Sequence, residues 1–226
     1  MDERNDRFWV EQSLLFFGQV SASLSHEINN VFSIINELAG LIDDHLLRID
    51  QDLPIDPEKL KDASDRIAKQ VKRGETLVKL LNRMAHSADH WSALVDVGEL
   101  VERIVAVCRR FATLRGATLE IGGTGERLEI TTNPFLLQQA IFRAVQMCLL
   151  AVDTSRSLKV EYEPAQSGGA VISVTGGDPV PDSDERRQFE ELLAQCAQEL
   201  GGSLELEPSG DAVRRVIINV PSGVAA

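Results

Sequence analysis

The sequence predicts an α+β protein in which a long N-terminal helical hairpin is followed by a C-terminal α/β sandwich. Two observations predict this class. Up to about residue 92, apolar residues recur at steps of three and four, which is the period of an amphipathic helix. From residue 93 onward, short β-type runs alternate with helical runs, an order typical of a layered α/β domain. We therefore expect two domains, residues 1–92 and 93–226.

The first expected helix covers residues 8 to about 49. Its apolar stripe repeats at helical steps and consists of Val10, Leu14, Phe17, Val20, Leu24, Ile28, Val31, Ile35, Leu38, either Leu41 or Ile42, Leu46 and Ile49. About 40 residues at 1.5 Å each give a helix of roughly 60 Å. No small domain covers that length, so the helix needs a helical partner.

The second expected helix supplies that partner. Pro54 and Pro57 break the chain, and Asp56 with Pro57 and Glu58 is typical of a helix start. The second helix then runs to about residue 88, and two long helices with a short loop form an antiparallel hairpin. One hairpin cannot bury both apolar stripes. We therefore expect a homodimer in which two hairpins form a four-helix bundle.

The second domain is expected to contain three helices and six strands. The helices cover 97–114, 135–152 and 184–200, and the strands cover 117–121, 128–131, 158–162, 171–174, 204–207 and 213–220. Glycines 116 and 201–202 are expected to end helices. A turn is expected at 176–177, a hairpin turn at 122–125, and a final hairpin around 209–211.

Composition excludes several classes of function. The net charge of −12 argues against a nucleic-acid partner, which would need a basic footprint. The sequence has no run of about 18 apolar residues, so no membrane span is predicted. The N-terminus does not resemble a signal peptide, and a cytoplasmic protein is therefore expected. Cys108, Cys148 and Cys196 lie in apolar helical patterns, which predicts buried reduced thiols. The histidines and cysteines show no metal-ligand spacing.

A polar face of the first helix carries the candidate chemistry. Its residues recur with helical spacing and are Gln19, Ser23, His26, Asn30, Ser33 and Glu37. His26 lies roughly 200° around the helix from Leu24, so its imidazole faces away from the packed stripe. Glu27 could accept the proton of one ring nitrogen and leave the other free to attack an electrophile. A lone surface histidine usually has no chemical role, so the interpretation depends on its neighbours.

The neighbours of His26 form a known pattern. The run L-S-H-E-I-N-N at residues 24–30 resembles the H-E-x-x-N-P phosphoacceptor motif of bacterial sensor histidine kinases. The resemblance implies that His26 is phosphorylated, that Glu27 is its acid/base partner, and that Asn30 orients a water or an aspartyl phosphate. Val31 stands where the family usually has proline, which predicts a straighter helix. The helical hairpin would then be the family's dimerisation domain.

The second domain resembles the ATP-binding domain of the same kinases. Residues 136–139 (L-L-Q-Q) resemble the entry to the family's Asn-rich helix. The stretches 201–205 and 219–221 resemble its last helix end and last strand. The resemblance therefore covers nearly the whole chain.

Parts of the family's nucleotide site are nevertheless missing. Arg143 and Met147 stand at the two asparagine positions, and a thioether is a poor ligand for Mg²⁺. Thr175 replaces the aspartate that binds adenine, and Pro179 replaces a glycine. The stretch 178–183 is too short for the family's flexible ATP lid. We therefore expect no cofactor, with ATP and Mg²⁺ binding lost.

These features together predict a histidine phosphotransferase of a bacterial two-component phosphorelay. A response-regulator receiver domain would be its partner, and His26 would carry the phosphoryl group on the outside of the dimeric bundle. The expected docking surface consists of Phe16, Phe17, Gln19, Ser23, Ser33 and Glu37.

Two alternatives remain open at the level of sequence. The same fold could be an active histidine kinase or a receiver phosphatase, the latter depending on Asn30. A different class would be a non-catalytic dimeric adaptor that binds a receiver or a kinase, for which His26→Ala leaves function intact.

Overall fold

The computed structural model describes residues 3–51, 53–54, 56–123, 125–151, 157–166 and 168–223, without the side chains of residues 3–6 and 49–50. Three sequence predictions fall outside that description: the side chain of Ile49, and the positions of Thr124 and Val152. The chain divides into two compact units, Met1–Ala85 and His86–Ala226. Each unit is described below by itself.

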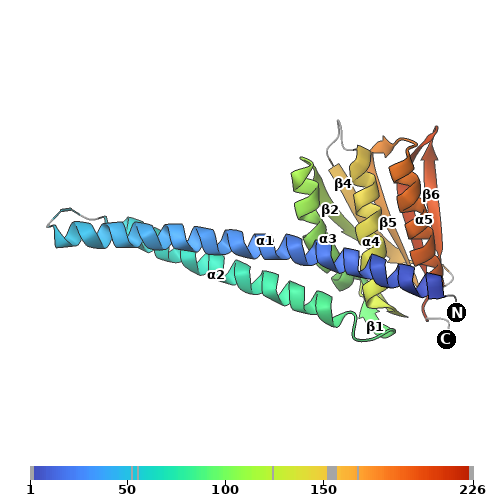
Figure 1. The fold of residues 1–226 in the computed structure, drawn as a ribbon, viewed down its shortest axis with the longest axis horizontal. Helices are drawn as coiled ribbons and strands as arrows, with labels where there is room; N and C mark the ends of the chain where they lie inside the picture. Colours follow the sequence, from blue (N-terminus) through green and yellow to red (C-terminus); the bar gives the residue numbers. More distant parts are fainter. Residues whose placement is uncertain are drawn as a thin grey trace. The chain divides into compact units, whose positions relative to one another are not determined.

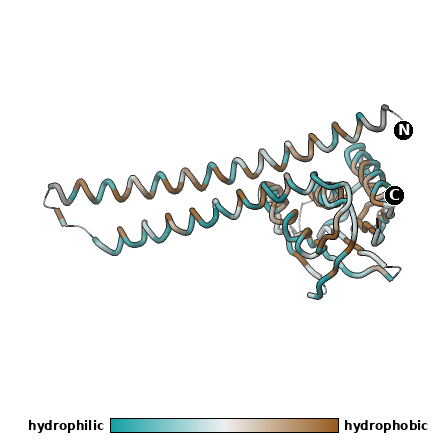
Figure 2. Tube along the Cα trace, turned by 90° about the horizontal axis from the view of Figure 1, so that it is seen from below, coloured by the Kyte–Doolittle hydropathy of each residue, from teal (hydrophilic) through white to brown (hydrophobic). Residues whose placement is uncertain are grey.

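The first unit is a helical hairpin. α1 (Glu3–Asp50) and α2 (Pro57–His86) run antiparallel, and apolar residues recur along both helices (Figures 1 and 2). The backbone N–H of Glu58 donates to Asp56 Oδ1 at 3.1 Å, which caps the start of α2 as predicted. The buried residues of the hairpin are Phe16, Val20, Ser23, Leu24, Val31, Leu38, Ala63 and Met84.

The second unit is a five-stranded sheet with helices packed on one face (Figure 1). The strand order is β2-β4-β5-β7-β6, with β2 and β4 parallel and the other neighbours antiparallel. The strands are β2 (Thr118–Gly123), β4 (Ser157–Pro164), β5 (Ala170–Val180), β6 (Ser203–Ser209) and β7 (Ala212–Val220). The helices are α3 (Val97–Leu114), α4 (Pro134–Cys148) and α5 (Asp184–Glu199), with a 3-10 turn, η1 (Leu149–Ala151), after α4. The predicted α+β class is confirmed.

Helix α4 lies at the centre of the second unit. Asn133 caps its N-terminus by accepting a hydrogen bond from Leu136 N at 2.9 Å. All of its residues are buried except Phe135 and Gln146. The segment Pro134–Ala151 is the one described helix long and apolar enough to cross a membrane, but 78% of it is buried inside the chain. It therefore serves as the core helix of this unit.

Strand β5 corrects one prediction. The expected turn at Gly176 and Gly177 is wrong, because the strand continues through both residues to Val180. Val180 still pairs with Val213, after a shift in register that begins beyond Thr175. Between the pair of Thr175 with Arg215 and this pair, β5 has five steps and β7 has two, so the ladder is irregular here although the strand continues.

Strand pairing corrects a second prediction. The expected hairpin at 122–125 is wrong, because β2 pairs with β4, while β3 (Glu129–Thr132) pairs with β1 (Ala93–Asp96). β1 is a four-residue strand that the sequence did not predict. Gly123 has a different use, since a Cβ there would lie 2.5 Å from ring atoms of Tyr162. The glycine lets the tyrosine ring pack against the backbone.

Glycines at the helix ends are confirmed as predicted. Gly116 has φ 70° and follows Arg115, the C-cap residue of α3, and Gly201 has φ 72° and follows Leu200, the C-cap residue of α5. Both are left-handed conformations that end helices at little cost only in glycine. The final hairpin of β6 and β7 is also confirmed.

Candidate functional site

His26 lies in the middle of α1 with an exposed side chain. Asn30 follows one turn later, and its Nδ2 lies 3.3 Å from His26 Nδ1. Residues four apart on a helix stack on the same face, which explains the contact. The helix continues without interruption through Val31, which is buried beside Gly74 of α2. The absence of proline at this position thus leaves a continuous helix under the histidine.

The contact with Asn30 determines which ring nitrogen of His26 can react. In the recorded orientation the amide Nδ2 donates to Nδ1, and the proton of a neutral ring then lies on Nε2. Nε2 has a free lone pair only when Nδ1 carries the proton. An amide turned to present Oδ1 accepts that proton, and the two orientations of an asparagine amide fit the same space. The pair can therefore hold the reactive tautomer of the imidazole.

Glu27 is bound across the hairpin. Its carboxylate forms an ion pair with Arg73 of α2. The sequence predicts Glu27 as the group that holds the ring, whereas the contact to the ring that the structure records comes from Asn30. The ion pair places a negative and a positive group on the residue that follows His26 and on the facing helix.

Two of the six predicted docking residues are buried, which corrects that part of the surface. Phe16 has no exposed surface, and Ser23 is 7% exposed. Phe16 precedes Val20 by four residues, so it lies on the buried stripe of α1. The remaining predicted residues are partly or fully exposed and are Phe17, Gln19, Ser33 and Glu37.

An apolar groove on the hairpin is a feature that the sequence did not predict. It has a volume of about 370 Å³ and an almost wholly apolar lining. The residues that line it are Ile28, Val31, Phe32, Ile35, Val71, Gly74, Glu75, Val78 and Lys79. At about 100° per residue, Ile28 lies roughly 200° around α1 from His26. The groove and the histidine therefore occupy opposite sides of the helix.

Comparisons with known proteins identify the fold. No protein-family model matches the chain, and no curated protein matches its sequence. Among solved structures, a nucleotide-free catalytic domain of histidine kinase ThkA is similar with a TM-score of 0.50 and 15% identity, covering 59% of this chain and 99% of that domain. Full-length ShkA in complex with AMPPNP is similar with a TM-score of 0.51 and 12% identity, covering 92% of this chain and 46% of ShkA.

The chain has the histidine kinase fold. In this fold, the two asparagine positions of the nucleotide helix correspond by the resemblance above to Arg143 and Met147, and both side chains are buried in α4. Arg143 Nη1 donates to Gln146 Oε1 at 2.9 Å. Burial lowers the pKa of the Arg143 guanidinium, and the nearby Cys196 acts in the opposite direction. The two positions are therefore filled by packed side chains.

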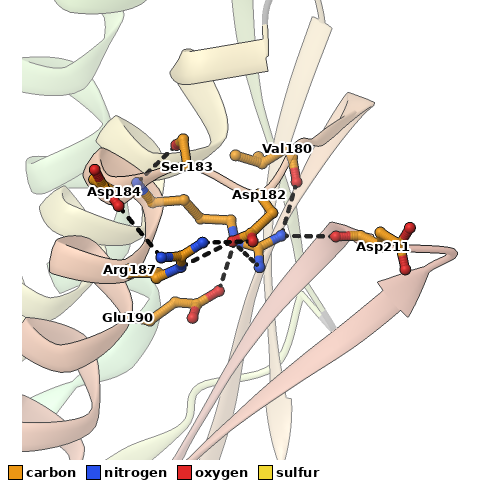
Figure 3. A network of polar contacts seen from close by, with 8 residues as sticks. Val180, Asp182, Ser183, Asp184, Arg187, Glu190 and Asp211 are labelled. Carbon is orange, nitrogen blue, oxygen red and sulfur yellow. Dashed lines mark hydrogen bonds and ion pairs between the residues drawn. The ribbon is translucent and has the colours of Figure 1, made fainter.

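The connection between β5 and α5 consists only of residues 181–183. Ion pairs hold it in place: Asp182 pairs with Arg187 at 2.7 Å (Figure 3) and with Arg186 at 3.0 Å. The hydrogen bond from Arg187 is the main reason that the pKa of Asp182 is lowered. A histidine kinase fold with so short a connection has little chain here to close over a ligand.

Proposed function

We propose that this protein is a histidine phosphotransferase of a two-component phosphorelay. His26 accepts a phosphoryl group from the aspartyl phosphate of a receiver domain and passes it to a second receiver. One observation supports the proposal: an exposed imidazole in mid-helix has its Nδ1 at 3.3 Å from the side-chain amide of Asn30. The histidine kinase fold supports the assignment.

The transfer step follows from that geometry. The lone pair of His26 Nε2 attacks phosphorus in line with the aspartyl oxygen, so a P–N bond forms as the P–O bond breaks. The electron pair of the broken bond leaves with the receiver's carboxylate. The phosphorylated ring becomes an imidazolium, whose Nδ1 proton is held by Asn30 Oδ1. Glu27 offsets the new positive charge of the ring, and Arg73 keeps that carboxylate in place.

A second copy of this chain is the proposed occupant of the apolar groove. One hairpin leaves Phe32 57% exposed and Val71 45% exposed at this groove. Val10, Leu14 and Leu46 continue the same side of α1 at helical spacing and are also exposed. Pairing two such faces gives a four-helix bundle with a closed core. His26, on the opposite side of α1, then stays accessible to a partner.

The side chains at the two asparagine positions favour a phosphotransferase over a kinase. ShkA was crystallised with AMPPNP, whereas here Arg143 and Met147 fill the corresponding helix. A buried guanidinium repels Mg²⁺, and a thioether does not ligate it well. The phosphoryl group would therefore come from another protein and not from ATP.

The test measures transfer of radiolabelled phosphate from purified phosphorylated receiver domains to the wild type and to His26→Gln. We expect label on the wild type and none on the variant. His90→Gln is the matched control, because His90 is another exposed histidine and should leave labelling unchanged. Equal labelling of the wild type and His26→Gln would refute the proposal.

A receiver phosphatase is the second candidate, favoured by the exposed amide of Asn30 beside the histidine. That amide could orient a water molecule toward an aspartyl phosphate. A phosphatase would empty the receiver without carrying label itself, and Asn30→Ala would stop it. The kinase alternative predicts clear binding of an ATP analogue with Mg²⁺ in a titration, and the adaptor alternative predicts normal function in His26→Ala.

A further inference from the structure

The sheet of the second unit has a cavity on its open face, opposite the helices. Gly176 of β5 faces α4, since a Cβ there would lie 3.8 Å from Cys148 Cβ. Successive side chains of a strand point to opposite faces, so Val171 and Ser173 lie on the open face. The cavity has a volume of about 230 Å³, and its lining includes Glu161, Glu163, Val171, Ser173 and Arg215. The sheet therefore separates this cavity from α4 and its filled positions.

Short side chains make the open face concave at this point. Gly122 of β2, Glu161 of β4 and Ser173 of β5 lie side by side in the sheet register. Gly122 has no side chain, and a Cβ there would lie 3.1 Å from Glu161 Cγ. Ser173 is short and only 2% exposed. The longer side chains of Glu161, Glu163 and Arg215 therefore form a rim around a low floor.

Two side chains of opposite charge in the lining retain bonding capacity. Arg215 Nη2 donates to Ser173 Oγ at 2.8 Å, but Arg215 Nε is buried and has no hydrogen-bond acceptor among the described residues. The exposed carboxylate of Glu163 has no hydrogen-bond or ion-pair partner in the part of the chain that the structure describes. Glu161 differs, because it pairs with Lys159. The cavity thus offers a ligand one donor that lacks an acceptor and one carboxylate that lacks a cation.

The spacing of these two groups limits the ligand. Arg215 Nη2 lies 3.8 Å from Glu161 Oε2, which places the guanidinium beside Glu161. Glu163 follows two residues later on the same face of β4, so its carboxylate lies roughly 7 Å further along the strand. Two hydrogen bonds of about 2.9 Å each fill most of that gap. The anionic and cationic groups of the ligand must therefore lie close together, as they do when one carbon carries both.

We propose that this cavity binds a free α-amino acid with an apolar side chain. The carboxylate of the ligand accepts hydrogen bonds from Arg215, and its ammonium group donates to Glu163, so both bonds join charged groups. An anion alone would be repelled by the two glutamates, and a cation alone would leave Arg215 Nε without an acceptor. Val171 offers the uncharged surface on which the side chain of the ligand packs. The volume lies below the roughly 300–1,000 Å³ typical of sites for drug-sized ligands, which fits a molecule as small as an amino acid.

Titration calorimetry on the full chain tests the site with L-leucine and with two analogues that each lack one charged group. Isocaproate lacks the ammonium group, and isoamylamine lacks the carboxylate. We expect saturable binding of L-leucine at millimolar concentrations or below, and binding of both analogues that is weaker by about tenfold or more, because each loses a hydrogen bond between charged groups. Equal binding of either analogue would overturn the proposal, and so would the absence of binding by each of L-leucine, L-valine, L-methionine and L-phenylalanine.

A pair of matched variants locates the binding. Glu163→Gln removes the charge but keeps the size of the side chain, so it should weaken L-leucine binding by about tenfold. Glu120→Gln is the control, because Glu120 is exposed on the same face, opposite Lys159 in the register, and does not line the cavity. We expect the control to bind L-leucine as the wild type does. Equal weakening in both variants would overturn the site in favour of a general effect of charge on this face.

Thermal unfolding gives a second readout, because a ligand that binds only the folded state raises the melting temperature. L-Leucine should raise it for the wild type and for Glu120→Gln, and an equal rise for Glu163→Gln would contradict the proposal. Arg215→Gln should also lose L-leucine binding, and Glu163→Gln decides if the circular dichroism spectrum shows that Arg215→Gln is misfolded. Binding here does not depend on phosphotransfer by His26. His26→Gln should therefore bind L-leucine as the wild type does, so that the failure of one proposal leaves the other standing.

Discussion

The two units of the chain use their central helices in opposite ways. α4 buries every residue except Phe135 and Gln146, so its surroundings form a complete core. α1 is more than three times as long, with 48 residues against 15, yet it leaves large apolar side chains exposed. Those residues are Val10, Leu14, Leu15, Phe32, Leu41, Leu46 and Leu47.

The difference shows where each unit can act. A helix that is buried all round has no face left for a ligand, and in α4 the filled positions include Arg143 and Met147. A helix with one polar and one apolar exposed face can bind two different partners at once. In α1 the apolar face suits a second copy, and the polar face with His26 suits a receiver. The proposed chemistry thus lies in the unit that leaves large apolar side chains exposed.

The largest expected effect tests the complete core. Phe142 has no exposed surface, and its ring meets Phe111 edge-on at a centroid distance of 5.2 Å. Phe142→Ala should lower the free energy of unfolding of the second unit by about 3–5 kcal/mol, because it removes buried area and leaves a cavity. Chemical denaturation followed by far-ultraviolet circular dichroism measures this free energy of unfolding. A loss below about 1 kcal/mol would show that α4 is not the packed centre of its unit.

The next effect tests the exposed apolar groove of the hairpin. Val71→Glu with Val78→Glu places two carboxylates in the apolar groove, where a dimer would bury them without partners. We expect the dimer to weaken at least a hundredfold, measured by sedimentation equilibrium. Thr76→Glu is the control, because Thr76 is exposed and lies roughly 200° around α2 from Val78. A wild type that sediments as a monomer would contradict the bundle.

A third effect comes from thiols in the complete core. Burial raises the pKa of Cys148 and of Cys196 to about 12 from about 9, and raises that of Cys108 as well. The folded state therefore keeps these thiols protonated where the unfolded chain would ionise them. Their contribution to stability is full below pH 9 and is lost as the pH rises from there toward 12.

The measurement has two parts. The free energy of unfolding should fall by about 1.4 kcal/mol per pH unit for each thiol above pH 9, and Cys148→Ala should make the fall shallower. At pH 8, a thiol reagent should modify the folded protein only as fast as it unfolds. Rapid modification of any cysteine in the native state would disprove the protonated, buried assignment.

The sequence predicted best those secondary-structure elements that depend on local residue patterns. The hairpin helices, α3 and the final hairpin follow from apolar period, proline breaks and glycine ends. β1 and the partner of β2 were not predictable in this way, because a strand's pairing partner is chosen by the whole sheet. Gly176 and Gly177 signal a turn by composition, yet tertiary pairing of Val180 with Val213 keeps the strand going.

The candidate site likewise contains contacts that local sequence patterns predict and contacts that they do not. The approach of Asn30 to His26 could be predicted, since residues four apart on a helix are neighbours. The pairing of Glu27 with Arg73 could not, because it depends on the register of α1 against α2 across 46 residues of chain. The burial of Phe16 could have been predicted, since Phe16 precedes the buried Val20 and Leu24 by four and eight residues.

The smallest expected effect sharpens the contrast between the units through their glycines. A Cβ added at Gly18 in α1 meets nothing within 4 Å, whereas a Cβ at Gly202 in the second unit would run into the carbonyl oxygen of Asn219. Gly18→Ala should therefore stabilise the hairpin by about 0.5–1 kcal/mol, since alanine loses less conformational freedom in a helix. Gly202→Ala, as the matched substitution, should lower the melting temperature instead. If both variants showed the same change in melting temperature, the proposed contrast between open space around α1 and close packing in the second unit would be wrong.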